Sequence, residues 1–332
     1  MGQSPPRVLV VILNYNGERL LPACLDSIAK HTADYRNYHV VVVDNASPDG
    51  SLRIVEERYP WVTPIQNGKN GGFGWGNNAI LARFEADHYV LLNNDTEVRP
   101  GWLSALVREA ESDPAIGVVG CKLLFPDGRI QHAGGSFSAY ALNHLGYLQE
   151  GSTCNTAQDV PWVTFAAVLI KRQVLERIGY MDEGFKPMYY EDPDFCFRAR
   201  AAGFRVRYTP ECVITHHENA STSQLPSAPK LYRQERNRLR FKLLHYSWRR
   251  WFREGHLVFE LKTIFWNAQK GFLRVSLKAW GANLVRLPAL LWWRWRPVRF
   301  VPSVFSPEGR HAPRVPFEAR PAPLPAERGS LK

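Results

Sequence analysis

Four short apolar runs in the first hundred residues constrain the fold most. They span residues 7–13, 39–43, 61–65 and 89–92, each ends in polar or glycine-rich sequence, and segments with helical spacing lie between them. Continuous apolar strands that alternate with helices are typical of a parallel sheet covered on both faces. We therefore expect an α/β fold whose ligands bind at the carboxyl ends of these strands.

Two acidic segments indicate the chemistry. Glu191, Asp192 and Asp194 fall within four residues, and Asp95 follows two asparagines directly after the run at 89–92. A carboxylate that holds a metal and another that takes a proton suit transfer from a phosphate-activated donor. The alternative for the segment at 191–194 is a helix start, where negative charge is favourable in any case.

Polar residues after the first two strands are candidates for nucleotide binding. Asn14 and Asn16 follow the run at 7–13, and Asp44 follows the run at 39–43. A carboxylate at a strand end can accept hydrogen bonds from a ribose or from a base N–H. The alternative is local, because Asn and Asp also form turns and cap helices.

A glycine-rich segment at 70–78 offers exposed backbone N–H groups just before a helix, which we expect at 77–85. It holds three further candidates for donor binding, Asn70, Gly72 and Asn78. Such a segment can hold a phosphate or close over a sugar. It is not a P-loop, because no Gly-Lys-Ser or Gly-Lys-Thr follows.

The proposed metal ligands are Asp95 and one of two adjacent histidines, His216 or His217. A Mg²⁺ or Mn²⁺ ion would bridge the carboxylate and phosphate oxygens and stabilise a leaving diphosphate. A histidine ligand favours Mn²⁺. A lone histidine more often has a structural role, so the sequence leaves both histidines open.

The net charge of +11 is a property of one segment. Residues 1–228 hold 20 Lys and Arg against 25 Asp and Glu, whereas residues 229–300 hold 17 against 3. Seven of the eleven Trp residues also lie in 229–300. Interleaved Trp and Arg favour an anionic membrane surface, although the Trp residues could instead pack against the main domain.

Other features concern location. The five cysteines are scattered without CxxC spacing, which fits a reducing compartment. The first residues lack the apolar core of a signal peptide, and no apolar run approaches membrane-spanning length. We expect a cytoplasmic protein, peripheral on the inner face of the cell membrane, with a poorly ordered Pro-rich tail at 301–332.

These motifs, in this order, resemble inverting glycosyltransferases of family 2, which have the GT-A fold. The resemblance runs from about residue 8 to about residue 241, and its parts are individually weak but jointly specific. They are VVILNYNG (10–17), VVVDNASPDGS (41–51), NGGFGWGNN (70–78), LLNNDTEV (91–98), GYMDEGFKPMYYEDPDFCFRARAAGFRV (179–206), HHENAS (216–221) and RQERNRLRF (233–241).

The resemblance implies residue roles. Asp44 would contact the nucleoside, with Asn14 and Asn16 near it. Asn94 and Asp95 stand where the family has its Asp-x-Asp motif, with only the last Asp kept. Glu191 and Asp192 match the family's Glu-Asp pair, whose Asp is the base, and His216 matches a late histidine that can approach the metal or diphosphate.

The resemblance also implies an organisation and a reaction. Residues 1–228 would form the GT-A domain, with a nucleotide-sugar half at 1–98 and an acceptor half at 99–228, followed by a basic helical region at 229–300. Asp192 would deprotonate an acceptor hydroxyl as it displaces the diphosphate. The donor would be a dTDP- or UDP-sugar, rhamnose first, and the acceptor lipid-linked or an oligosaccharide. Phe165, where related sequences usually have Gly, would fill volume near the substrate.

Two rival functions remain open from the residues alone. A nucleotidyltransferase also uses an α/β sheet, a metal and a nucleotide, but it would usually carry a basic loop where residues 14–17 have no Lys. A nucleic-acid-binding protein would explain the basic segment. It would not explain the acidic cluster at 191–194, which repels a phosphate backbone, so we expect no nucleic-acid partner.

Overall fold

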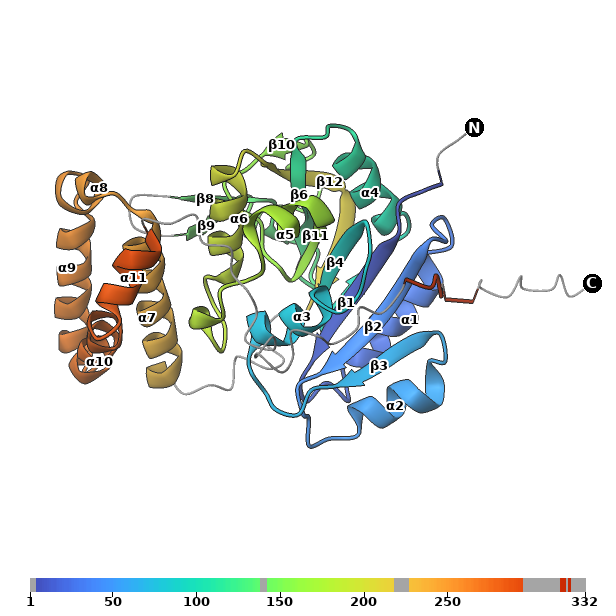
Figure 1. The fold of residues 1–332 in the computed structure, drawn as a ribbon, viewed down its shortest axis with the longest axis horizontal. Coiled ribbons are helices and arrows are strands. Elements are labelled where there is room, and N and C mark those ends of the chain that lie inside the picture. Colours follow the sequence, from blue (N-terminus) through green and yellow to red (C-terminus); the bar gives the residue numbers. More distant parts are fainter. Residues whose placement is uncertain (1–3, 138–141, 218–226, 295–316, 321, 324–332) are drawn as a thin grey trace, which may run out of the picture.

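The computed structural model describes residues 4–137, 142–217, 227–294, 317–320 and 322–323. One mixed sheet with helices on both faces forms the main body, and a group of helices stands beside it (Figure 1). The strand order along the sheet is β10-β12-β6-β11-β4-β1-β2-β3, with β5 paired to β12 and β7 paired to β6. The expected α/β fold is therefore present, as is the C-terminal helical region.

The first half of the chain builds the parallel part of the sheet. Its four strands run parallel to their neighbours, because α1, α2 and α3 provide the crossovers between them. The elements are β1 (Val8–Asn14), α1 (Leu21–His31), β2 (Tyr38–Asp44), α2 (Ser51–Arg58), β3 (Val62–Gln66), α3 (Phe73–Leu81) and β4 (His88–Asn93).

The second half extends the same sheet. Strand β11 runs antiparallel between β4 and β6. The elements are β5 (Thr96–Val98), α4 (Trp102–Glu111), β6 (Ile116–Leu124), β7 (Ile130–His132), β8 (Gly135–Phe137), β9 (Leu142–His144), β10 (Gln158–Asp159), β11 (Ala167–Lys171), α5 (Arg172–Ile178), the 3₁₀ turn η1 (Glu183–Phe185), α6 (Glu191–Ala201) and β12 (Arg205–His216).

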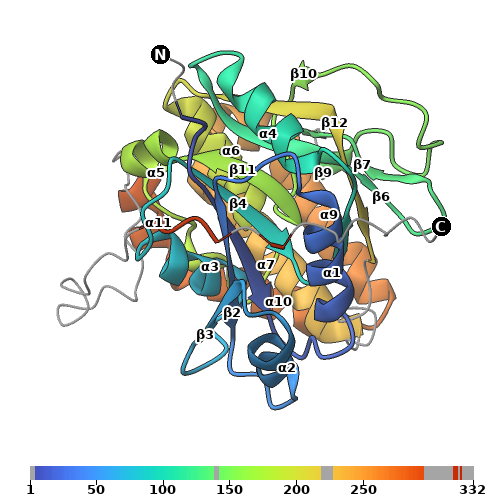
Figure 2. The same ribbon diagram turned by 90° about the vertical axis from the view of Figure 1, so that its right-hand side faces the viewer.

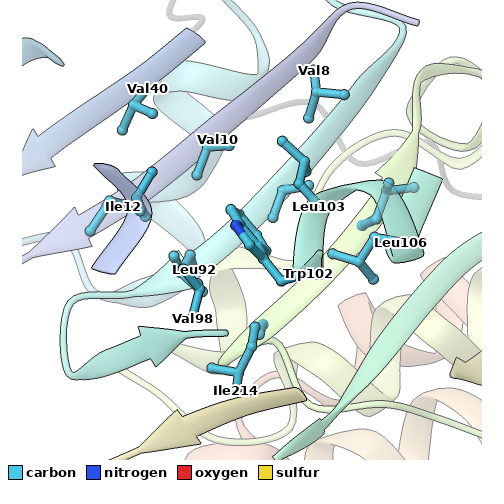
Figure 3. Packing of buried hydrophobic residues seen from close by; sticks show 14 of the residues in the cluster. Val8, Val10, Ile12, Val40, Leu92, Val98, Trp102, Leu103, Leu106 and Ile214 are labelled. Carbon is cyan, nitrogen blue, oxygen red and sulfur yellow. The ribbon is translucent and has the colours of Figure 1, made fainter. Parts of the chain in front are cut away.

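Alternate residues of the buried strands supply two cores. Val8, Val10 and Ile12 of β1 face α1, α2 and α4, whereas Leu9 and Val11 face α3, α5 and α6. Figure 2 shows this layering along the sheet. In Figure 3 the indole of Trp102, at the start of α4, lies in the first core among the side chains of β1 and β4. Both faces of the strands are buried, as their continuous apolar sequence predicts.

The described part of the basic segment folds as five helices, of which α7 packs on the segment before α6. They are α7 (Ser227–His245), α8 (Trp248–Arg253), α9 (His256–Gln269), α10 (Leu273–Leu284) and α11 (Leu287–Arg294). A third core joins Leu239 and Phe241 of α7 to Phe185 of η1. Among the described residues, no helix combines the length and the apolar character needed to cross a bilayer.

Part of the Pro-rich tail lies against the main domain, which differs from the expected poor order. The Arg320 N–H donates to the Tyr38 carbonyl at 3.0 Å, and the Ala322 N–H donates to the Tyr38 hydroxyl at 2.8 Å. Ala322 is buried as a result. The rest of the segment at 301–332 lies outside the described residues.

Candidate active site

The carboxyl ends of β1 and β2 bring three predicted donor-binding residues together. Asn14 ends β1, Asp44 ends β2, and the two are direct partners in register. The Asn14 amide donates to Asp44 Oδ1 at 2.7 Å and to the Ser51 hydroxyl at 2.8 Å. The Asn94 amide donates to Asn14 Oδ1 at 2.7 Å. These side chains form one hydrogen-bonded cluster at the edge where α/β sheets bind ligands.

Both carboxylate oxygens of Asp44 accept hydrogen bonds within this cluster. Asp44 is buried, and Ser47 donates its N–H to Oδ2 at 2.8 Å and its hydroxyl to Oδ1 at 2.5 Å. The same hydroxyl accepts the N–H of Asn16, whose side chain is exposed. The local role that the sequence offered as the alternative for Asp44 is therefore present, and the Asp44 contact with a nucleoside stays a prediction.

Gly17 was not predicted as a site residue, yet its backbone lies directly against the side-chain amides of Asn14 and Asn94. A Cβ atom at this position would lie 2.0 Å from Asn14 Oδ1 and 2.4 Å from Asn94 Nδ2. Any side chain would therefore break the hydrogen bond between these two amides. The signal in the sequence is the glycine that ends the Asn-Tyr-Asn-Gly turn.

The glycine-rich segment lies against the loop that precedes α6. Gly72 has a φ of 89°, and a Cβ there would come within 2.6 Å of the Pro187 carbonyl oxygen. The Phe73 N–H donates to that same oxygen at 2.8 Å. Asn70 is exposed, and its side-chain oxygen accepts the Gly72 N–H at 3.1 Å. Helix α3 consequently begins inside the segment, at Phe73, and not at residue 77 as expected.

Asn78 is placed differently from the expectation that it binds the donor. It is fully buried; its side-chain N–H donates to the Met181 carbonyl at 3.0 Å, and its oxygen accepts the Met181 N–H at 3.1 Å. The amide also contacts Glu183 at 3.2 Å. Asn78 therefore joins α3 to the segment before α6 and presents no free amide to a donor.

Asp95 and His216 meet at the far end of the same edge. His216 Nε2 lies 3.1 Å from Asp95 Oδ1, and both residues are buried. His217 turns away and pairs with Glu97 at 2.6 Å. The structure thus distinguishes between the two histidines. Burial would raise the pKa of Asp95, but the His216 imidazole more than offsets it, and the pKa lies below its usual value.

The contact between Asp95 and His216 has the character of a cation site. His216 Nδ1 lies 2.6 Å from Gln131 Oε1, which can only accept, so Nδ1 carries the proton and Nε2 presents its lone pair in the neutral ring. Asp95 Oδ1 is buried, and it has no hydrogen-bond partner among the described residues unless His216 Nε2, at 3.1 Å, carries a proton. Two acceptors held 3.1 Å apart require a proton or a metal ion between them.

The residues fit a metal that the donor would help to bind. No group of three or more His, Cys, Asp or Glu with metal-binding geometry occurs in the part of the chain that the structure describes. Asp95 and His216 would therefore supply two ligands, which suits an ion that binds with a diphosphate and water. Gln131, which orients His216, was not predicted.

Glu191 and Asp192 begin α6 on a strained backbone. Tyr189 and Tyr190, directly before them, have φ values of 81° and 77°. Non-glycine residues in this left-handed region cost of order 1–3 kcal/mol each, and such strain clusters at functional sites. Glu191 is buried, and Asp192 keeps partial contact with solvent. The solvent-facing member of the pair is thus the predicted base.

Both carboxyl groups are shifted toward the protonated form. Burial, and after it the neighbouring Asp192 charge, raises the pKa of Glu191 to about 8. Burial raises the pKa of Asp192 to about 7, although hydrogen bonds from its own N–H, the Phe165 N–H and the Thr164 hydroxyl favour the charged form. A carboxylate with a pKa near neutrality suits general base catalysis.

A short segment links the two acidic centres. Thr164 and Phe165 bond to Asp192, and the next carbonyl, that of Ala166, accepts the Asn93 N–H at 2.8 Å. Asn93 lies two residues before Asp95, so both carboxylates flank one strand end. The Phe165 ring itself is buried against Phe195, with centroids 5.5 Å apart, so it fills the core and not the substrate space as expected.

Helix α7 supports the strained loop before α6 through hydrogen bonds to the backbone of that loop. Asn237 is fully buried, and its Nδ2 donates to the carbonyls of Phe185, Met188 and Tyr189 at 2.6, 2.9 and 2.9 Å. Arg240 bonds Asp182 Oδ2 through Nε and Nη2 at 2.9 and 2.6 Å. The sequence motif at 233–241 had no assigned role. These contacts show that it positions the loop that leads to Asp192.

Asp194 belongs to this support and not to the reaction. It is fully buried, and it accepts hydrogen bonds from Arg198 at 2.9 Å and His245 at 2.7 Å. Burial would raise the pKa of Asp194, but the charges and hydrogen bonds of these two partners lower it. Asp194 is therefore held in a structural ion pair, whereas the neighbouring Glu191 and Asp192 have raised pKa values.

Comparison with known proteins identifies several similar chains. The chain is 32% identical over 75% of its length to the uncharacterized protein y4gI of Sinorhizobium fredii and 32% over 66% to the O-antigen biosynthesis protein RfbC of Myxococcus xanthus. It spans 28% and 18% of these two relatives. It is 26% identical over 66% of its length to the N-acetylglucosaminyl-diphospho-decaprenol L-rhamnosyltransferase of Mycobacterium tuberculosis, covering 78% of that protein.

Solved structures show the same fold. GalNAc-T7 with UDP, GalNAc and Mn²⁺ aligns with a TM-score of 0.60 at 16% identity, over 74% of this chain and 49% of that one. The mannosyltransferase PcManGT of Pyrobaculum calidifontis with GDP-Man and Mn²⁺ aligns with a TM-score of 0.53 at 19% identity, over 87% and 79%. The sequence model of Glycosyl transferase family 2 matches residues 9–179, just over half of the 332 residues, and the chain therefore belongs to that family.

Proposed function

We propose that the protein transfers one sugar from a nucleotide-diphosphate sugar to an acceptor hydroxyl with inversion at the anomeric carbon. The observation that carries the proposal is the pairing of two carboxylate centres at one strand end. At one centre a buried Asp95 oxygen faces the His216 lone pair. At the other, Asp192 has a pKa near neutrality and partial access to solvent.

Asp192 is the base of this proposal. Its carboxylate takes the proton of the acceptor hydroxyl while that oxygen forms a bond to the anomeric carbon. The bond from this carbon to the diphosphate oxygen breaks on the opposite face, and its electron pair leaves with the nucleoside diphosphate. The Thr164 hydroxyl and the Phe165 N–H orient Asp192 for this transfer. Glu191, buried beside it, keeps its own proton at neutral pH and so limits charge repulsion.

Asp95 and His216 would hold a Mg²⁺ or Mn²⁺ ion together with the diphosphate. Such an ion, when bound, neutralises the charge that develops on the leaving phosphate. Gln131 orients the His216 ring, because its Oε1 accepts a hydrogen bond from Nδ1–H, with 2.6 Å between the two atoms. Two structural neighbours contain Mn²⁺ with a nucleotide or nucleotide-sugar, which supports a divalent ion here.

A sugar-lipid acceptor and a rhamnose donor are the first candidates for the substrates. The match covers 78% of the length of the M. tuberculosis relative, and the name of that relative specifies rhamnose transfer to a lipid-linked sugar diphosphate. Sugars of both dTDP and UDP remain candidate donors, because internal hydrogen bonds occupy Asp44, the residue expected to contact the nucleoside. Exposed Asn16 and Asn70 are the remaining donor contacts.

The donor test is a screen of nucleotide-sugars for thermal stabilisation, with and without Mn²⁺. A ligand at 100 times its Kd stabilises a protein by about 2.7 kcal/mol, which is readily detected. We expect stabilisation by one nucleotide-sugar that depends on Mn²⁺ and is lost in Asp95→Ala. Stabilisation that is equal in this variant, or no response to any nucleotide-sugar, would contradict the proposal.

The C-terminal helices support association with the inner face of a membrane, because their polarity is inverted. The inward stripe of α9 and α10 contains Glu260, Asn267, Ser276 and Asn283, all buried and hydrogen-bonded. Their outer faces carry exposed apolar side chains. These are Val258, Leu261, Phe265, Trp266, Leu273, Leu277 and Leu284. A helix in water normally shows the opposite arrangement.

Charge makes an anionic membrane the best partner for this outer face. The exposed cations beside the apolar residues include Lys262, Lys270 and Arg274. A second copy of the chain would bring like charges together, whereas lipid phosphates would neutralise them. At 14 and 12 residues, α9 and α10 suit a position in the interface plane.

A vesicle experiment tests this part of the proposal. The double variant Leu261→Ser/Phe265→Ser removes two exposed apolar groups of α9, and Leu148→Ser is the control on the main domain, where Leu148 is 45% exposed. We expect the double variant to lose most of its partitioning to phosphatidylglycerol vesicles and the control to keep it. Equal partitioning of all three proteins would refute the assignment of this face.

A further inference from the structure

A cavity of about 480 Å³ lies outside the proposed catalytic centre, between α7, α10 and η1. Its ten lining residues include Arg236, Arg240, Lys278 and Arg286, and no carboxylate. Arg240 is buried and Arg236 is half-buried, whereas Lys278 and Arg286 are exposed at the rim, so an anion that enters this open cavity would meet four positive charges.

Internal partners neutralise only one of the four cations. Arg240 pairs with Asp182. Arg236 donates to the carbonyls of Gly184 and Lys186, and Lys278 lies 5.2 Å from the centre of the Tyr232 ring. No carboxylate of the described residues pairs with Arg236, Lys278 or Arg286. Burial, and after it the charges of Arg240 and Arg286, lowers the pKa of Arg236. The cluster repels itself and would be relieved by an anion.

The position of the cavity joins the reactive loop to the apolar outer face. Gly184 lines it on one side and belongs to the segment that leads to Asp192. Val285, at the end of α10, lines it on the other side and is 85% exposed. The adjacent Leu284 and Leu277 are each 54% exposed on α10. The cavity therefore offers four cations and, beside them, exposed apolar side chains.

We propose that this cavity binds the diphosphate of an isoprenoid-linked acceptor, with the lipid lying along the exposed face of α10 and the attached sugar directed toward the loop before Asp192. This inference rests on the proposed function and specifies its acceptor class. A group with two phosphates and an apolar chain matches both parts of the cavity, the cations and the margin. A free phosphate or a nucleotide would satisfy the cations but would leave Val285, Leu277 and Leu284 exposed to water.

Three changes test the cavity while sparing the catalytic groups. Lys278→Ala/Arg286→Ala removes two cations that no described carboxylate holds. Gly281→Leu fills the cavity from α10, since a Cβ at Gly281 has no neighbour within 4 Å and leucine favours a helix more than glycine does. Arg253→Ala is the control, because Arg253 is exposed on α8 of the same helical region and outside the cavity lining.

The measurement is calorimetric titration of the full chain with farnesyl diphosphate, inorganic diphosphate, UDP and farnesol, without any donor sugar. We expect farnesyl diphosphate to bind most tightly, and the double alanine variant to weaken it roughly tenfold or more per cation removed. Gly281→Leu should abolish this binding while its thermal stability is unchanged or higher. Arg253→Ala should bind like the unmodified chain.

Three outcomes would overturn the proposal. The first is an unchanged affinity for farnesyl diphosphate in Gly281→Leu or in the double variant. The second is an equal affinity of the unmodified chain for inorganic diphosphate, which would indicate a free-phosphate site. The third is a loss of UDP binding in the same variants, which would indicate a nucleotide site. The readout is independent of turnover. If no nucleotide-sugar stabilises the protein but farnesyl diphosphate binds as predicted, the proposed reaction is wrong and the anion site remains supported. If a nucleotide-sugar stabilises the protein but farnesyl diphosphate does not bind as predicted, only the proposed role of the cavity is wrong.

Discussion

Replacing Asn237 tests whether helix α7 positions the catalytic loop. In Asn237→Ala the carbonyls of Phe185, Met188 and Tyr189 lose a buried donor that contacts them at 2.6–2.9 Å. The side chain touches neither of the two acidic centres. We therefore expect a loss of turnover that arises from the shape of the loop and leaves donor binding intact.

The magnitude follows from the contacts. Leaving buried polar groups without a partner costs about 1–3 kcal/mol. The loop also holds Tyr189 and Tyr190 at positive φ, each at a cost of order 1–3 kcal/mol that the surrounding contacts must offset. We expect Asn237→Ala to lower the free energy of unfolding by about 2–3 kcal/mol. If a similar free energy is lost from loop positioning, kcat falls roughly 10- to 100-fold.

The assay compares two matched variants by urea denaturation and by steady-state kinetics. Asn267→Ala is the control: Asn267 is also a buried amide of the helical region, and it donates to Glu235 at 2.5 Å and to Ser276 at 3.0 Å. Both variants should lose comparable stability, but only Asn237→Ala should lose kcat, with an unchanged KM for the donor. Asn237→Asp should be worse than Asn237→Ala, because it sets an acceptor against three carbonyls. Equal kcat values for Asn237→Ala and Asn267→Ala would refute the reasoning.

Three further predictions concern the site. Burial raises the pKa of Asp192 to about 7 and that of Glu191 to about 8, so the native pair binds protons that the unfolded chain releases near pH 4. The contribution of this pair to the free energy of unfolding should therefore fall from about pH 4 to pH 8, and kcat/KM should rise through about pH 7. The stability difference between the unmodified chain and Asp192→Asn measures this contribution, and a difference that does not change with pH would count against the shift. Gly17→Ala should raise the donor KM at least about tenfold by separating Asn14 from Asn94, and a wild-type KM would show that this contact is dispensable. His216→Ala should weaken Mn²⁺-dependent donor binding by about 10- to 100-fold and His217→Ala should not, so equal Mn²⁺ titrations would remove His216 from the metal site.

Much of the fold is predictable from local sequence. Strands β1 and β2 follow from continuous apolar runs, and α2 has the expected bounds at Ser51–Arg58. Helix α3 begins earlier than expected because a glycine-rich sequence does not look helical. The structure needs glycine there, since a Cβ at Gly76 would lie 2.4 Å from Leu13. The full length of β12 does not follow from the sequence, because Pro210 and Glu211 interrupt the apolar alternation and the register shifts between Thr209 and Val213.

The sequence identifies the candidate acids but not the residues that support them. Asp95, Glu191 and Asp192 are recognisable because acidic residues at strand and helix ends are local patterns. Gln131 and Asn237 are not, because each acts through a partner 85 or about 50 residues away in the chain. The sequence also could not say which face of α9 is buried. Its apolar stripe is clear, but tertiary contacts place the polar stripe inside.

The most direct test of the account is turnover and donor binding by Asp192→Asn in the full chain. The substitution keeps the size of the side chain and removes its ability to accept a proton. We predict a fall in turnover of about 10²–10⁴-fold, while Mn²⁺-dependent affinity for the nucleotide-sugar stays within about twofold. Turnover close to that of the unmodified enzyme, with the donor bound normally, would contradict the assignment of Asp192 as the base.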